Sequence, residues 1–221
     1  MTKLRTFGLA CFAAFLMAAA PRAATAQQKV SVDFRGGLGI PTGDLGNVED
    51  MGPAFTVGLD VGIHPRIALR AEGGAEIYSG TDLSTGETAP NMTLTHFNGG
   101  VLFHLMPPAS DQRFSADVNV GGGITILTSE RRAYSIETPG GAGTAIVDYS
   151  NVYPAINAGL SLAYALSPQV DAFVSGQGSL TLAKENDLNS QQLALIAPEA
   201  TTLKNVYSFP VAVGLRFNFQ P

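Results

Sequence analysis

The stretch YSFPVAVGLRFNF, at residues 207–219, carries the clearest structural signal in this 221-residue sequence. Its odd positions hold tyrosine, phenylalanine, valine and leucine, whereas its even positions are mostly small or polar. Successive side chains of a β-strand point to opposite faces of the sheet, so a period of two indicates a strand. The segment is therefore predicted to form a strand with one apolar face and one small or polar face.

The same alternation recurs along the chain, and no helix-period pattern of useful length follows residue 27. Together with the closing segment it predicts eight strands. The other seven are residues 30–40, 55–64, 67–78, 95–105, 114–126, 155–166 and 170–182.

The connections between these strands alternate in length. Short segments with proline lie at Pro65, at Pro107 and Pro108, and at Pro168, whereas residues 41–54, 79–94, 127–154 and 183–206 form long polar stretches. Short turns at one rim and long loops at the other are typical of a membrane barrel. The glycines around residues 140–143 further predict a hairpin that extends the fifth and sixth strands above the membrane.

Two architectures fit this alternation: a membrane barrel with its apolar face outward, and a soluble lipocalin-like barrel around an apolar pocket. The polar faces are rich in glycine, alanine, serine, asparagine and threonine, which suit the crowded interior of a small barrel. The strands are also long enough to cross a bilayer at a tilt. We therefore predict an all-β fold, a closed eight-stranded antiparallel transmembrane up-and-down β-barrel. The strands at 30–40 and 207–219 should pair, because an open edge would leave backbone groups unpaired in hydrocarbon.

The N-terminus predicts export. Lys3 and Arg5 precede an apolar run of about 14 residues, too short to span a bilayer, and Ala24-Thr25-Ala26 is a small-residue cleavage site. We predict a signal peptide at 1–26, cleaved near Ala26, and a barrel domain at 27–221. The single cysteine, Cys11, falls within the signal peptide, which excludes disulfides and thiolate metal sites from the mature chain.

The charge balance of the mature chain is acidic. Without Lys3, Arg5 and Arg22, 10 basic residues remain against 18 acidic ones, a net charge of −8. Nucleic-acid binding needs a basic surface, so nucleic-acid partners are excluded. Only 14% of the whole chain is charged, below the roughly 25% typical of soluble domains.

These features together resemble the small outer-membrane β-barrel family typified by the OmpA transmembrane domain and OmpX. The carriers are the signal peptide, the eight strands, the loop lengths and the closing VAVGLRFNF at residues 211–219. The resemblance implies a place in the cell outer membrane, in contact with outer-membrane lipid. An eight-stranded barrel needs no partner to close, which predicts a monomer. The resemblance also implies that the assembly machinery reads the C-terminal strand through Phe217 and Phe219, although Gln220 and Pro221 follow here. The fold hosts adhesins, scaffolds, narrow channels and a few enzymes, so the resemblance alone assigns no activity.

If the polar faces point inward, the lumen contains three arginines among five carboxylates. Burial of such charges is costly unless they are paired, which predicts an ion-pair network that plugs the lumen. The alternative is a porin-like small diffusion channel, in which a broken pair opens a narrow pore. The residues of the predicted network are Asp33, Arg35, Asp60, Arg70, Glu72, Asp117, Asp171 and Arg216.

We predict that the chain is not an enzyme and that it has no cofactor and no metal site. The only histidines are His64, His96 and His104, and the chain lacks a Gly-x-Ser-x-Gly elbow. A further alternative is a barrel enzyme that acts on outer-membrane lipid through His96, near the long-loop rim. The acidic residues of the first long loop, Asp44, Glu49 and Asp50, are expected to be solvated, with a divalent cation as the alternative.

Aromatic residues near the strand ends are predicted to form girdles at the membrane interfaces. The candidates are Phe55, Tyr78, Phe103, Phe114, Tyr153, Tyr164, Tyr207, Phe217 and Phe219.

Overall fold

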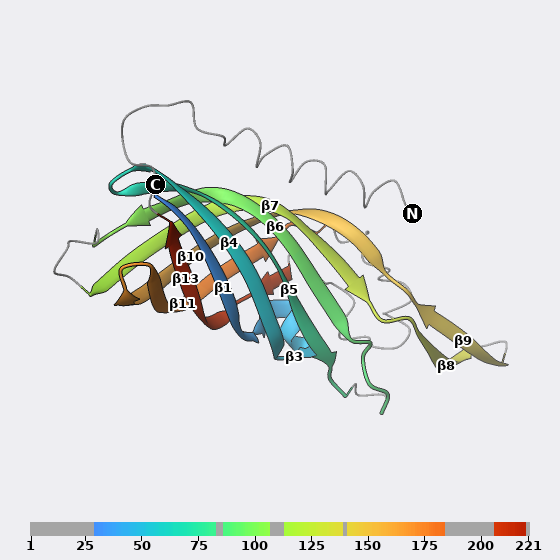
Figure 1. The fold of residues 1–221 in the computed structure, drawn as a ribbon. Coiled ribbons are helices and arrows are strands. Elements are labelled where there is room, and N and C mark those ends of the chain that lie inside the picture. The colour runs from blue at the N-terminus through green and yellow to red at the C-terminus, as the bar shows by residue number, and fades with distance from the viewer. Residues whose placement is uncertain (1–28, 83–85, 107–112, 139–140, 184–205, 220–221) are drawn as a thin grey trace.

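The computed structural model describes residues 29–82, 86–106, 113–138, 141–183 and 206–219 (Figure 1). The predicted signal peptide lies outside the described residues. Eight long antiparallel strands form a ring in which each strand pairs with the next along the chain. They are β1 (Val30–Gly39), β4 (Gly52–His64), β5 (Ile67–Gly80), β6 (Met92–His104), β7 (Phe114–Ser129), β10 (Ser150–Ser167), β11 (Val170–Thr181) and β13 (Val211–Phe219).

The ring closes through the first and last strands. β1 and β13 pair antiparallel from Val30 opposite Phe219 to Leu38 opposite Val211. Every long strand therefore has a hydrogen-bonded neighbour on both sides, as a wall in contact with lipid requires. The predicted eight-stranded antiparallel β-barrel is confirmed, and Figure 1 shows its tilted strands.

The closing segment was predicted to be one continuous strand, but it forms two strands. β12 (Val206–Ser208) pairs with β11 and with β2 (Pro41–Thr42), whereas β13 pairs with β11 and β1. Phe209 and Pro210 separate them, and proline has no backbone N–H for the ladder. The Phe209 amide instead donates to the carbonyl of Ile40 at 2.9 Å.

Several strands run beyond their predicted ends on the long-loop side. β10 begins at Ser150 rather than 155, and β7 ends at Ser129 rather than 126. Above them, β8 (Arg132–Thr138) and β9 (Gly141–Val147) form the predicted two-stranded hairpin. Figure 1 shows this hairpin projecting past the end of the barrel.

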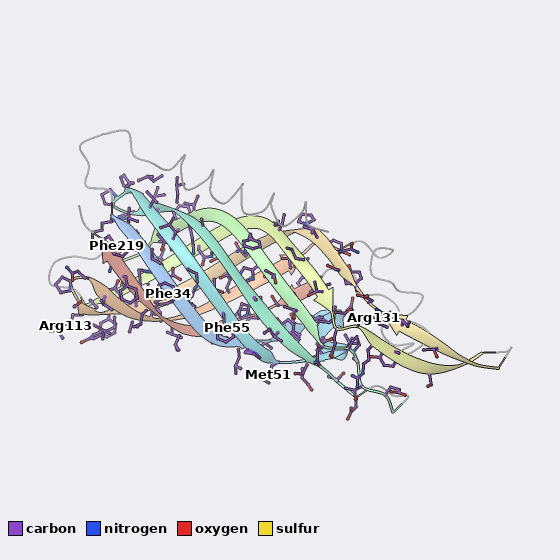
Figure 2. All side chains as sticks on the ribbon, turned by 45° about the vertical axis from the view of Figure 1, so that its right-hand side comes forward. Phe34, Met51, Phe55, Arg113, Arg131 and Phe219 are labelled. Atoms are coloured by element: carbon purple, nitrogen blue, oxygen red, sulfur yellow. The ribbon has the colours of Figure 1, made fainter. Side chains whose placement is uncertain are left out.

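The outer surface of the barrel is apolar. Figure 2 shows Phe34, Phe55 and Phe219 on the outside of the wall, and each is more than half exposed. Phe103, Phe114 and Tyr207 are also exposed, as expected for residues in contact with lipid or its interface.

Two of the predicted girdle residues do not belong to the outer surface. Tyr78 is fully buried and Tyr153 is 5% exposed, because both lie among the buried apolar residues at the long-loop end of the barrel. The prediction that they are interfacial is wrong. Both residues lie near a strand end, as predicted, but their side chains point to the inner face of the barrel wall.

Within the described ranges, no helix is long and apolar enough to cross a membrane, a finding that concerns helices alone.

Candidate functional site: the barrel lumen

The barrel interior is built from the polar faces of the strands, and small residues make room there for charged ones. A Cβ atom added at Gly58 on β4 would meet the guanidinium of Arg70 and, at 2.5 Å, the Asp33 carboxylate. By contrast, the nearest atom to a Cβ at Gly99, on the outer face, is 4.0 Å away. The glycine at 58 therefore makes the close packing of the ion pairs possible.

Arg70 of β5 is the centre of the largest cluster. Its Nη1 donates to both carboxylate oxygens of Asp60, at 2.7 and 2.8 Å, and its Nη2 donates to Asp33 Oδ2 at 2.7 Å. Its Nε donates to Glu72 Oε2 at 3.1 Å. One buried guanidinium thus binds three buried carboxylates from three strands. Arginine suits this position because its planar fork presents five donors in fixed directions.

Glu72 joins this cluster to the opposite wall. Its Oε2 accepts from Arg35 Nη2 of β1 at 2.7 Å, in addition to Arg70. Its Oε1 accepts amide hydrogen bonds from Asn98, Asn157 and Gln177, at 3.4, 2.9 and 2.6 Å. The donors come from β1, β5, β6, β10 and β11, so one carboxylate connects five strands across the lumen.

A second cluster lies nearer the short-turn end. Arg216 Nη1 of β13 donates to Asp117 Oδ2 of β7 at 2.8 Å, and His104 Nδ1 of β6 lies 2.7 Å from Asp117 Oδ1. The Arg216 guanidinium also lies over the inward-facing ring of Phe173, 5.4 Å from its centroid. His104 was not among the predicted network residues. The alternation placed it on the polar face, but its carboxylate partner depends on the register of β6 against β7.

The structure brings Asp33, Arg35, Asp60, Arg70 and Glu72 into one cluster and Asp117 and Arg216 into another. Asp171 joins neither. It lies opposite Arg216 in the β11–β13 register, yet its Oδ2 accepts a hydrogen bond from Asn218 Nδ2 at 2.8 Å. It is also only partly buried.

Above the Arg70 cluster, Glu76 of β5 accepts hydrogen bonds from the hydroxyls of Tyr78 and Ser208. His96 Nδ1 of β6 lies 3.9 Å from Glu76 Oε1. His96 and Ser208 thus both lie beside the Glu76 carboxylate, and together these side chains form a buried polar layer.

The long-loop end of the lumen is filled by an apolar cluster that the sequence did not predict. The first long loop folds back as β2, a 3-10 turn η1 (Gly43–Asn47) and β3 (Glu49–Asp50), here called the cap (residues 41–50). Leu45 and Val48 of the cap are buried there, and Figure 1 places η1 and β3 at the end of the barrel away from the C-terminus. The other members of the cluster are Tyr78, Ala89, Met92, Leu94, Leu127, Tyr134, Val147, Tyr149, Tyr153, Ala183 and Val206.

The first-loop acids do not share one environment. Asp50 is exposed and Asp44 is half-buried, but Glu49 is buried, so the predicted solvation of Glu49 is wrong. The reason is the pairing of β3 with β5, which turns alternate side chains to opposite faces. In the described part of the chain no group of three or more histidine, cysteine or acidic side chains could hold a metal ion.

Comparisons with known proteins bear on the fold. No protein-family model matches the chain, and no curated protein matches it in sequence. Among solved structures, it is similar to a major outer-membrane protein of Thermus thermophilus, with a TM-score of 0.55 and 13% identity over 88% of this chain and 100% of that one. It is also similar to Neisserial surface protein A, with a TM-score of 0.53 and 11% identity over 89% of this chain and 100% of that one. The chain therefore has the fold of the small eight-stranded outer-membrane β-barrels, the OmpA and OmpX type that its sequence resembles.

Proposed function

We propose that this chain is a non-catalytic, integral protein of the outer membrane with a plugged lumen and a structural or surface-interaction role. The N-terminal segment would direct export. The C-terminal strand, through Phe217 and Phe219, would present the chain to the outer-membrane assembly machinery. The long loops would face the exterior, and the short turns the periplasm.

The observation that carries this proposal is the filling of the lumen at successive depths. From the short-turn end, the lumen is filled in turn by the Asp117 cluster, the Arg70 cluster, the layer around Glu76 and the apolar cap cluster. Side chains largely fill the interior of an eight-stranded barrel. Here the charges of the two clusters are also paired with one another, which neutralises them in the part of the lumen that a conducting pore would use.

The first test is conductance in planar lipid bilayers. We expect the purified protein to give no steady single-channel conductance between pH 6 and 7, because each described depth of the lumen is filled. Faster gel migration of the unboiled sample than of the boiled one would establish that the inserted barrel is folded. Steady conductance from a folded sample would overturn the plug and support the small diffusion channel instead.

The proposed orientation can be tested by cysteine labelling, since the only natural cysteine is Cys11. Arg131 and Arg113 are both exposed and lie at opposite ends of the barrel (Figure 2). In intact cells, a membrane-impermeant maleimide should label Arg131→Cys fully and Arg113→Cys only after the outer membrane is permeabilised. The reverse pattern would contradict the proposed orientation, and equal labelling of both would contradict membrane insertion.

A further inference from the structure

Glu49 is the one acidic side chain of the cap that is buried. It is 2% exposed, and in the described part of the chain no side chain donates a hydrogen bond to either carboxylate oxygen. No lysine, arginine or histidine among the described residues forms an ion pair with it. A buried charge without a partner is strongly unfavourable, so the closed cap requires the neutral acid.

The cap pairs with the barrel over short stretches. β3 pairs with β5 at two positions, Glu49 opposite Gly80 and Asp50 opposite Ser79. Beside them, the Thr81 amide donates to the carbonyl of Val48 at 2.9 Å. The short β2–β12 pairing and the burial of Leu45 and Val48 also hold the cap in place. Such a segment can open locally without unfolding of the barrel.

We propose that Glu49 is a pH-sensitive latch: the cap stays closed over the exterior end of the lumen while this carboxyl is neutral, and opens when it ionises. The inference goes beyond the proposed function, because it concerns the cap alone. The ion-pair clusters beneath it would still plug the lumen when the cap is open.

The groups around Glu49 favour its neutral form. Burial raises the pKa of Glu49 from an ordinary 4.5 to about 8; a hydrogen bond from the Met92 backbone amide lowers it in part, and the neighbouring Asp50 raises it. The other titratable groups near it are the hydroxyls of Tyr78 on β5 and Tyr134 on β8. The nearby cation, Arg132, instead donates to the carbonyls of Thr88 and Ala89 and lies over the Tyr134 ring.

The direction of the pH effect follows from the pKa of Glu49 in the open cap and in the closed cap. In the open cap Glu49 is hydrated and ionises near 4.5, whereas in the closed cap it ionises near 8. Between these values the open state binds fewer protons, so rising pH favours opening, by up to about tenfold for each unit. Above about pH 8 both states are ionised and the dependence ends.

The test measures exposure of the cap core through a single added thiol. In the Cys11→Ser protein purified from outer membranes, Val48→Cys is labelled with a maleimide at pH 5.5 to 8.5. Each rate is divided by that of the exposed Arg131→Cys at the same pH, which removes the intrinsic pH dependence of thiol reactivity. We expect this ratio to rise by up to about tenfold per unit up to about pH 8, and to stay low and flat when Glu49→Gln is added.

A matched control is Asp50→Asn, which removes the adjacent exposed acid and should leave the slope in place. A flat ratio without Glu49→Gln, or an equal slope with it, would overturn the latch. If Val48→Cys does not show the heat-dependent gel shift of a folded barrel, Leu45→Cys reports on the same cluster. Because the readout is labelling, conductance of the unsubstituted protein would refute the plug without deciding the latch.

Discussion

Arg70→Ala is expected to lower the free energy of unfolding of the barrel by about 3–5 kcal/mol, the usual range when one partner of a buried ion pair is removed. The structure gives the reason. Arg70 donates to both carboxylate oxygens of Asp60 and is a principal partner of Asp33. Its loss leaves buried carboxylates with Arg35 as the one remaining cation of the cluster. Urea unfolding in lipid vesicles, followed by the gel mobility of the folded form, measures the change.

Two further variants separate pairing from general damage. Arg113→Ala removes an exposed arginine that donates to the Tyr164 hydroxyl, and its unfolding midpoint should not move. Asp60→Ala combined with Arg70→Ala should cost clearly less than the sum of the two single changes, because the second change removes a charge that the first left unpaired. Strict additivity would show that Arg70 and Asp60 do not interact as the structure places them.

The fold could be predicted from the sequence because alternate residues of a barrel strand face two different environments, lipid and lumen. Each outward position must be apolar in lipid, and each inward one must be small or polar. A period of two therefore marks the strands, and the avoidance of open edges in hydrocarbon requires closure. The same pattern predicts that residues such as Arg70 and Asp117 lie on the inward face, although it does not predict their partners.

The pairing inside the lumen could not be predicted, because it depends on strand register and side-chain length rather than on local pattern. Arg216 faces Asp171 on the adjacent strand, yet binds Asp117, 99 residues away in sequence. The cap could not be predicted from the sequence for a different reason. Leu45 and Val48 are isolated apolar residues in a polar loop, and no periodicity distinguishes them from exposed ones. Their burial is a tertiary effect.

Glu72→Ala is expected to destabilise the barrel about as strongly as Arg70→Ala. This carboxylate accepts hydrogen bonds from two arginines and three amides on five strands. Without it these donors lose their common acceptor, at a cost of about 3–5 kcal/mol, and water can enter at the middle of the plug. We expect urea unfolding in lipid vesicles to show this loss, while conductance stays at zero because the Asp117 cluster, the Glu76 layer and the cap cluster still fill the lumen.

Glu72→Gln and Asp171→Asn show which property of Glu72 matters. A glutamine amide oxygen can still accept from Asn157 and Gln177, but its NH2 group would face the donors of Arg35 and Arg70. Glu72→Gln should therefore also destabilise the barrel, although less than Glu72→Ala, because two donors retain their acceptor. Asp171→Asn removes a lumen carboxylate outside both clusters, which accepts from the Asn218 amide, and should cost clearly less stability than Glu72→Ala. If Asp171→Asn destabilised the barrel as much as Glu72→Ala, stability would depend on total lumen charge rather than on the five-strand junction at Glu72.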